Sequence, residues 1–449
     1  MSFYPRCLLG LILCAGLAAC ATYHAAPLAS APPLRNSVAE LHHQLPDGSA
    51  IAVAGPLSLR DVAALAVLND PDLVAARAQH DVAAADLLTA GLPPDPSITG
   101  GFAALLSGPG TMPAITAGFT QDVGALITYR ATRQAAEAGL AQVDAGILWQ
   151  EWQVASQAEQ LAVAISADQA NVASLETDNT VLSSVYRATQ AQIAQGNLTL
   201  NEGAVSMAAL AGVQSALDTA RQSAAHDQNQ LDALLGLEPG TVIPLAMVDV
   251  APLAQGVVEP ALATLAQRRP DLIALRYGYT QADAKLRAAI LSQFLPLSLG
   301  GTGGRDTSGV YSAGPQVTLT LPLFNRNRGA IAAAQATRAA LAAQYQASLA
   351  SAVGGARALN ASIALLHGQE IEAQAQAEQA AAMLRSARGA YEAGQISATA
   401  FATLQATAGE RMRAFVALRG QVQTAEISLA TLLGLGLPPL GSAPEEHAL

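Results

Sequence analysis

The sequence predicts a mixed, mainly α-helical fold, in which a long antiparallel coiled coil of helices joins a β-barrel that crosses a membrane. Three observations predict it. Hydrophobic residues make up 51% of the 449 residues and aromatic residues only 4%. Alanine dominates this apolar content, and it favours long helices that pack closely. Two very long stretches contain no proline, and short motifs recur at one spacing along the chain, which indicates a tandem internal repeat.

The recurring motifs divide the chain into two similar halves. Three segments recur in the same order at an offset of 198 or 199 residues: PDLVAAR at 71–77 and PDLIALR at 270–276, AQGNLT at 194–199 and EAGQIS at 392–397, LLGL at 234–237 and at 432–435. Alanine content does not explain the shared proline, aspartate and glycine positions. The predicted organisation is therefore a signal peptide (1–19), an extended linker (20–56), a first repeat (57–236), an equatorial connection (237–258), a second repeat (259–434) and a C-terminal tail (435–449).

The first repeat is expected to contain a helix, two strands and a long helical hairpin. A helix is expected over 59–90, because prolines follow it, and strands over 97–106 and 114–123. Apolar residues at spacings of 3, 4 and 7 then predict one very long helix over 129–195. After Gly196 the chain is expected to return as a helix to about residue 235.

The second repeat is expected to follow the same plan. Its elements are a helix over 259–293, strands over 295–304 and 314–324, a long helix over 329–392 and a returning helix to 433. Val317, Leu319 and Leu321 alternate with Thr318 and Thr320, which is the apolar-out, polar-in pattern of a barrel wall. The glycines of 300–304 lack the lysine of a phosphate-binding loop and are typical of a tightly packed wall.

Four strands of about ten residues can span a membrane, but they cannot close into a barrel on their own. Open strand edges are not tolerated in lipid. The protein is therefore expected to oligomerise. Two copies would supply eight strands and three copies twelve, and the number of strands does not choose between them.

The N-terminus has the pattern of an exported lipoprotein. An apolar run follows the basic start, and the cleavage region reads Leu17-Ala18-Ala19-Cys20, which resembles a bacterial lipobox. Lipidation is expected at Cys20, the one cysteine left after cleavage, and Ala21 favours the outer membrane. The alternatives are ordinary cleavage that leaves a free thiol, and an uncleaved anchor.

Together these features resemble the TolC family of outer-membrane efflux ducts. The repeat, the PDL helix starts, the glycine turns and the segment LPLFNRNRG at 321–329 carry the resemblance. It implies a homotrimer with a twelve-stranded barrel and a periplasmic helical tunnel. It also implies a passive exit duct for small solutes, drugs or metal ions, that docks a periplasmic adaptor linked to an inner-membrane pump. The alternatives are a structural coiled-coil lipoprotein and a type I secretion exit duct.

The resemblance places the functional residues at the two glycine turns. Adaptor docking is expected at Gly196 and Asn197 and at Gly394 and Gln395. Both turns also fit plain helix C-caps. The gate candidates are Glu202, Asn201, Tyr391 and Arg388. The alternatives are a solvated helix face for Glu202 and packing for Tyr391.

Other functions find little support in the sequence. The net charge is −11 without a basic cluster, which argues against nucleic acid. None of the seven histidines has a metal-ligand spacing, and no catalytic constellation is apparent. We therefore expect no enzyme activity, no cofactor and no bound metal.

Overall fold

The computed structural model describes residues 23–45, 48–108, 110, 112–254, 256–293, 297–319 and 324–436. Cys20 and the expected signal peptide lie outside these residues, as do Thr320 and Leu321. The chain divides into two units, 1–34 and 35–449. In the first unit, residues 23–34 are exposed and form no helix or strand. The remaining description concerns the second unit.

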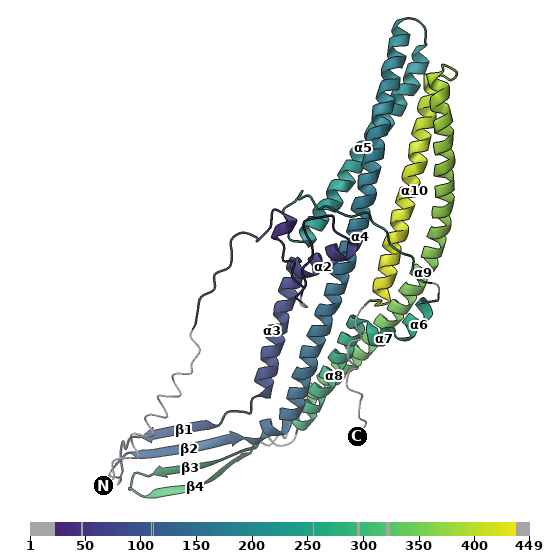
Figure 1. The fold of residues 1–449 in the computed structure, drawn as a ribbon. Helices are drawn as coiled ribbons and strands as arrows, with labels where there is room; N and C mark the ends of the chain where they lie inside the picture. Colours follow the sequence, from purple (N-terminus) through teal and green to yellow (C-terminus); the bar gives the residue numbers. More distant parts are fainter. Residues whose placement is uncertain are drawn as a thin grey trace. The chain divides into compact units, whose positions relative to one another are not determined.

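The described residues of the second unit form helices and four strands in the order that the sequence predicts (Figure 1). The first half consists of η1 (Val38–Glu40), α2 (Leu59–Asn69), α3 (Pro71–Gly91), β1 (Ser97–Ala103), β2 (Ala114–Asp122), α4 (Val123–Ala194) and α5 (Leu200–Leu234). The second half consists of α6 (Val258–Ala263), α7 (Leu265–Arg268), α8 (Pro270–Leu291), β3 (Leu297–Arg305), β4 (Tyr311–Leu319), α9 (Arg328–Glu392) and α10 (Ala398–Leu432). The fold is mainly helical with a small antiparallel sheet.

The helices before the strands are broken where single helices were expected. Asp70 has φ −55° and ψ 123°, and its side chain accepts a hydrogen bond from the Leu73 amide at 2.8 Å. Arg269 is also extended, with φ −73° and ψ 121°. Both residues precede a proline, which disfavours the helical conformation. The prediction of one continuous helix over 59–90 and of another over 259–293 was therefore wrong. Helix α3 begins at Pro71 and helix α8 at Pro270.

The segment before α2 packs on the helices. Val38, Leu41 and Ile51 are buried in one apolar cluster with residues of α2, α4 and α5. Parallel bridges join Arg35 to Leu237 and Leu57 to Leu245. Residues 35–45 and 48–56 of the predicted linker (20–56) therefore pack on the helices, because apolar side chains between the prolines reach the core.

The long helices form two hairpins, α4 with α5 and α9 with α10. Helix α4 also packs against α2, α3, α8 and α10, whereas α9 packs mainly against α8 and α10 and reaches α6 through an ion pair of Arg357 with Glu259. Helix α4 accordingly contains more buried residues than any other described helix, and α9 buries few side chains, mainly alanines. Helix α4 occupies the centre of the unit and α9 lies at its edge.

Helix α9 is long and apolar enough to meet the compositional requirement for crossing a membrane. Its hydropathy comes largely from alanine, and it carries Gln335, Arg338 and Gln344. Arg338 pairs with Asp283 of α8 at 2.7 Å. Because α9 packs along α8 and α10, we interpret it as a coiled-coil helix.

The four strands form one antiparallel sheet in the order β1-β2-β3-β4, so β1 and β4 are its edges. Strand β4 begins at Tyr311, three residues before the expected start. The turn that precedes it is short, because the Asp306 carboxylate accepts hydrogen bonds from the amides of Ser308 and Val310. The sheet lies at the end of α3, α4, α8 and α9 opposite the hairpin turns (Figure 1).

Candidate functional sites

The two faces of the sheet differ in chemistry. Residues paired directly across antiparallel strands share a face, and the register sets Phe102, Ile115, Arg305 and Tyr311 in one row. The same face, which we call the apolar face, carries every exposed large hydrophobic residue of the described strands. These are Ile98, Phe102, Ile115, Phe119, Leu299, Tyr311, Val317 and Leu319.

The opposite face, which we call the polar face, carries small and hydroxylated side chains. Its larger members are Ser97, Thr99, Thr116, Thr120, Asp122, Ser298, Thr302, Ser312, Gln316 and Thr318. Val317 and Leu319 thus lie on the apolar face and Thr318 on the polar face, and the alternation predicted for these three residues is confirmed. A sheet with one apolar and one polar face can separate lipid from water.

Glycines let the strands approach each other closely on the polar face. A Cβ atom at Gly304 would lie 2.6 Å from the Ile115 carbonyl oxygen, and one at Gly300 would overlap the Phe119 carbonyl. Neither position accepts a side chain without a shift of the backbone. Gly300 and Gly304 therefore allow β2 and β3 to pack closely.

Both glycine turns reverse the chain with the same backbone geometry. Gly196 has φ +80° and Gly394 φ +70°, values that glycine adopts at little cost. The amide of the next residue, Asn197 or Gln395, donates to a carbonyl five residues back at 2.9 or 2.8 Å. Helices α4 and α9 therefore end in the same C-cap. We call these turns, with the adjoining ends of both helices (190–203 and 388–401), tip 1 and tip 2.

In tip 1, the gate candidate Glu202 caps a helix. Its carboxylate accepts hydrogen bonds from the Thr199 amide at 2.8 Å and from the Thr199 hydroxyl at 3.0 Å. These bonds hold the pKa of Glu202 below its usual value. The neighbouring candidate, Asn201, is exposed. Glu202 is thus an ionised residue with a local structural role at the start of α5.

In tip 2, the candidates Tyr391 and Arg388 have different surroundings. The Tyr391 ring stacks on Phe401, with centroids 4.8 Å apart and planes 3° apart, and both belong to one apolar cluster. Arg388 lines a groove of ≈ 340 Å³ together with Arg385 and Asp178. Tyr391 therefore packs, as its alternative interpretation held, and Arg388 faces a groove that contains a buried acid.

A buried polar cluster joins the two hairpins, and the sequence analysis did not predict it. We call it the tie between the hairpins. Asp178 of α4 is buried, and its carboxylate accepts hydrogen bonds from Gln405 at 2.7 Å and Arg413 at 2.9 Å, both on α10. A Cβ at Gly409 would collide with this carboxylate. A signal was present, because Asp178 occupies a core position in the 3-4-3 spacing of Leu175, Leu182 and Val185, where an acid needs a partner.

Comparisons with known proteins agree with this geometry. Residues 259–435 match the family described as outer membrane efflux protein. The predicted resemblance is therefore confirmed. The chain is also similar to the outer membrane protein OprJ of Pseudomonas aeruginosa, with 27% identity over 219 residues. That alignment covers 46% of each protein, so the chain spans about half the length of the curated relative it matches.

Solved structures of outer membrane channels share the fold. The Campylobacter jejuni CmeC channel has a TM-score of 0.70 and 18% identity, over 85% of this chain and 86% of that one. The Neisseria gonorrhoeae MtrE channel has a TM-score of 0.70 and 16% identity, over 92% and 99%. The match to the efflux-protein family contains β3, β4, α9 and α10, and hence tip 2, while tip 1 lies outside it.

Proposed function

We propose that this protein is the passive exit duct of a tripartite efflux pump in a bacterial outer membrane. It carries small solutes, drugs or metal ions, from the periplasm to the exterior. Three copies form a twelve-stranded barrel above a periplasmic tunnel of helices, and lipid at Cys20 adds an anchor. The observation that carries this proposal is the division of the sheet into an apolar and a polar face.

The geometry of the sheet supports a membrane wall completed by other copies. Strands β2, β3 and β4 each have nine residues, close to the length that a tilted membrane strand needs. Strands β1 and β4 have no partner on their outer sides within the described chain, and unpaired edges are costly in lipid. Pairing β4 of one copy with β1 of the next satisfies both edges.

The two halves support a helical tunnel built from one repeated unit. Helices α4 and α9 end in the same glycine C-cap, and α5 and α10 end in matching turns at Gly236 and Gly434. Helix α9 leaves Leu365, Ile371 and Met383 more than half exposed. A neighbouring copy that covers this helix would turn six hairpins into a closed cylinder.

The membrane wall is tested by placing one charge on each face of β4. Asp in place of Val317 should destabilise the inserted oligomer by about 1–3 kcal/mol, because the charge would meet lipid. Asp in place of its neighbour Thr318 should leave the oligomer stable and shift the conductance toward cations. The measurements are the fraction of heat-resistant oligomer and the planar-bilayer conductance. Equal behaviour of the two variants would refute the assignment of the faces. A conducting monomer would refute the closure between copies.

The tips are the proposed docking site for a periplasmic adaptor that links the duct to an inner-membrane pump. Gly196, Asn197, Gly394 and Gln395 are proposed as its contacts, since they form the ends of the hairpins farthest from the sheet (Figure 1). Replacement of Gly394 by Asp should leave the oligomer inserted and conducting, yet reduce export in cells. Full export by this variant and by Gly196→Asp would place docking elsewhere on the helices.

The gate is proposed at the same end. Glu202 and Asn201 of tip 1 and Arg388 and Tyr391 of tip 2 remain the candidates, and the tie of Asp178 to Arg413 would hold the two hairpins together in the resting state. Glu202→Gln should alter block of the channel by multivalent cations, because it removes one charge per copy. Unchanged block would leave Glu202 with its capping role alone.

The lipid anchor is tested separately. Mass spectrometry of the membrane-extracted protein should find a diacylglycerol on Cys20, and Cys20→Ser should remove it. Assembly should persist in this variant, because the strands hold the membrane by themselves. An unmodified Cys20 in the wild-type protein would refute the anchor.

A further inference from the structure

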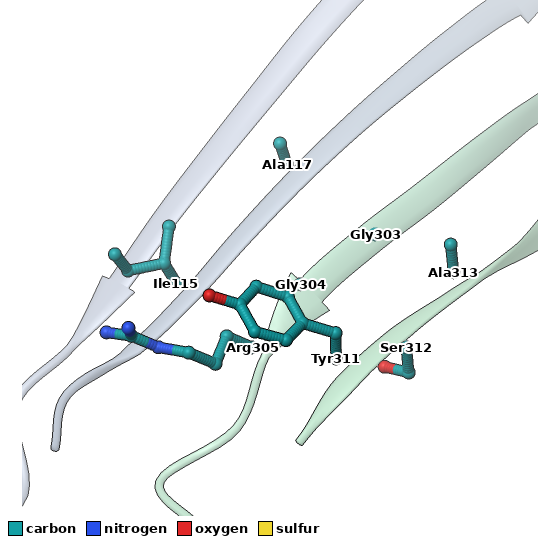
Figure 2. Close-up of a pocket in the computed structure, with 8 residues that line it drawn as sticks. All are labelled: Ile115, Ala117, Gly303, Gly304, Arg305, Tyr311, Ser312 and Ala313. Atoms are coloured by element: carbon teal, nitrogen blue, oxygen red, sulfur yellow. The ribbon is translucent and has the colours of Figure 1, made fainter. Parts of the chain in front are cut away.

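A single cation lies on the apolar face of the sheet. Arg305 is the last residue of β3 and the only Lys or Arg in the four described strands. Ile115 and Tyr311 flank it on the neighbouring strands. Figure 2 shows the guanidinium group of Arg305 beside Ile115, with the Tyr311 ring close to it. An arginine at such a place requires a partner or access to water.

A recess lies next to this arginine. The adjacent row on the same face holds Ala117, Gly303 and Ala313. These residues are small, so the surface of the sheet is recessed there. Arg305, Tyr311 and Ile115 border the resulting pocket of ≈ 560 Å³ (Figure 2). The pocket therefore combines an apolar floor with a cation and a phenol at its rim.

The described residues do not satisfy the guanidinium group. Nη2 donates one long hydrogen bond, 3.4 Å, to the Pro113 carbonyl. Nε is buried and has no hydrogen-bond partner among the described residues, and no acid of the described chain forms an ion pair with Arg305. A partly desolvated cation without an anion is costly. The chemistry of the pocket calls for an anion that also tolerates an apolar floor.

We propose that this pocket binds the phosphate group of an anionic lipid, with an acyl chain lying along the apolar face. The proposal rests on the proposed function, in which the apolar face meets lipid and the sheet end far from the helices faces the exterior. Arg305 then lies at the level of the headgroups, where arginine and tyrosine side chains are favoured. A guanidinium binds phosphate oxygens through paired hydrogen bonds. A lipid brings the phosphate and the apolar partner together, whereas free phosphate brings only the anion.

The test measures lipid retained by the purified oligomer in a neutral detergent, using native mass spectrometry. The probes are phosphatidic acid and phosphatidylcholine with the same acyl chains, and inorganic phosphate serves as competitor. We expect one phosphatidic acid per chain, preferred over phosphatidylcholine and not displaced by inorganic phosphate. Arg305→Gln should weaken retention at least about tenfold, since it removes a charged hydrogen-bond donor. The control Arg328→Gln removes an exposed arginine outside the sheet and should retain the lipid.

Several results would overturn the proposal. Equal retention by Arg305→Gln would remove the arginine from the site, and equal loss in Arg328→Gln would indicate a general effect of charge. Equal retention of phosphatidylcholine would indicate a purely apolar site, and displacement by inorganic phosphate a free-anion site. Conductance separates this inference from the proposed function. A protein that conducts without selecting phosphatidic acid refutes only the lipid site, whereas a protein that does not insert or conduct refutes the duct.

Discussion

The two hairpin tips share the same backbone geometry, but different side chains pack between their helices. Counted 198 residues apart, Gly196 corresponds to Gly394, and both turns use the same positive φ and the same hydrogen bonds. The side chains behind the turns differ in size. In tip 1, Ile193 lies so close to Gly203 that a Cβ there would be 2.6 Å from its Cδ1. In tip 2, the corresponding pair is Tyr391 and Phe401, stacked at 4.8 Å.

This comparison separates what the turn requires from what the packing allows. Only glycine fits the reversal without strain, so both tips use it. In tip 1, the isoleucine side chain fills the space between the two helices because its partner position is glycine. In tip 2, two aromatic rings fill the corresponding space. Tip 1 adds an ionised cap, Glu202 on Thr199, whereas tip 2 has only Ser397, whose hydroxyl accepts from the Ala400 amide at 3.2 Å. We infer that tip 2 depends more on apolar packing and tip 1 more on charge.

The largest expected effect is in the interior of tip 2. Phe401→Ala should reduce the free energy of unfolding by about 3–5 kcal/mol, because it removes a ring that is 97% buried and leaves Tyr391 without its stacking partner. Urea denaturation followed by circular dichroism measures the change. Met207→Ala, at a half-exposed position of α5, is the control and should cost little. If Phe401→Ala reduced the free energy of unfolding as little as Met207→Ala does, tip 2 would not depend on apolar packing as we infer.

The tie between the hairpins should come next. Asp178→Asn removes the charge that Arg413 pairs with, and we expect a loss of about 3 kcal/mol, because Arg413 still has partial access to water. The position that corresponds to Asp178 in the second hairpin is Gln376, which is on the edge helix α9. Gln376→Ala should therefore change stability far less. Similar losses for the two variants, in the same denaturation experiment, would contradict the central position of α4.

A pH effect of about 1 kcal/mol is expected for Asp168 after allowance for solvent screening. Burial, with a smaller contribution from Asp227, raises the pKa of Asp168 to about 6. The charged form is thus disfavoured in the folded chain. This penalty is complete above pH 6 and disappears as pH falls toward the ordinary value of 3.8. Asp168→Asn should be more stable than the wild type at pH 7, with the difference reduced at pH 5, as measured by thermal denaturation. The corresponding residues of the second hairpin, Leu366 and Ala425, carry no charge. A constant difference across this pH range would contradict the raised pKa.

The smallest effect is expected at the caps. Glu202→Gln should weaken the start of α5 only slightly, because an amide can still accept from the Thr199 amide but lacks the charge. Ser397→Ala should cost about 1 kcal/mol, since it removes the only side-chain cap of α10. Hydrogen exchange of the first turns of α5 and α10 resolves these local differences. Unchanged exchange in Glu202→Gln would contradict the dependence of tip 1 on charge.

The sequence by itself determined the long helices, the four strands, the glycine turns and the resemblance to efflux proteins. Each of these follows from local patterns: apolar spacing for α4 and α9, alternation for Val317 to Leu319, and a backbone conformation that favours glycine at Gly196 and Gly394. The breaks at Asp70 and Arg269 were also encoded locally, by the prolines that follow them, and were overlooked.

Only the tertiary structure decided which residues from distant segments meet. The burial of Leu41 and the stacking of Tyr391 on Phe401 depend on contacts between elements. So do the tie of Asp178 to Arg413 and the isolation of Arg305 on an apolar face. A one-residue change of strand register would move Arg305 to the polar face, and a quarter turn of α4 would expose Asp178. Local pattern sets the conformation of each segment, but the environment of a charge depends on the packing of every segment around it.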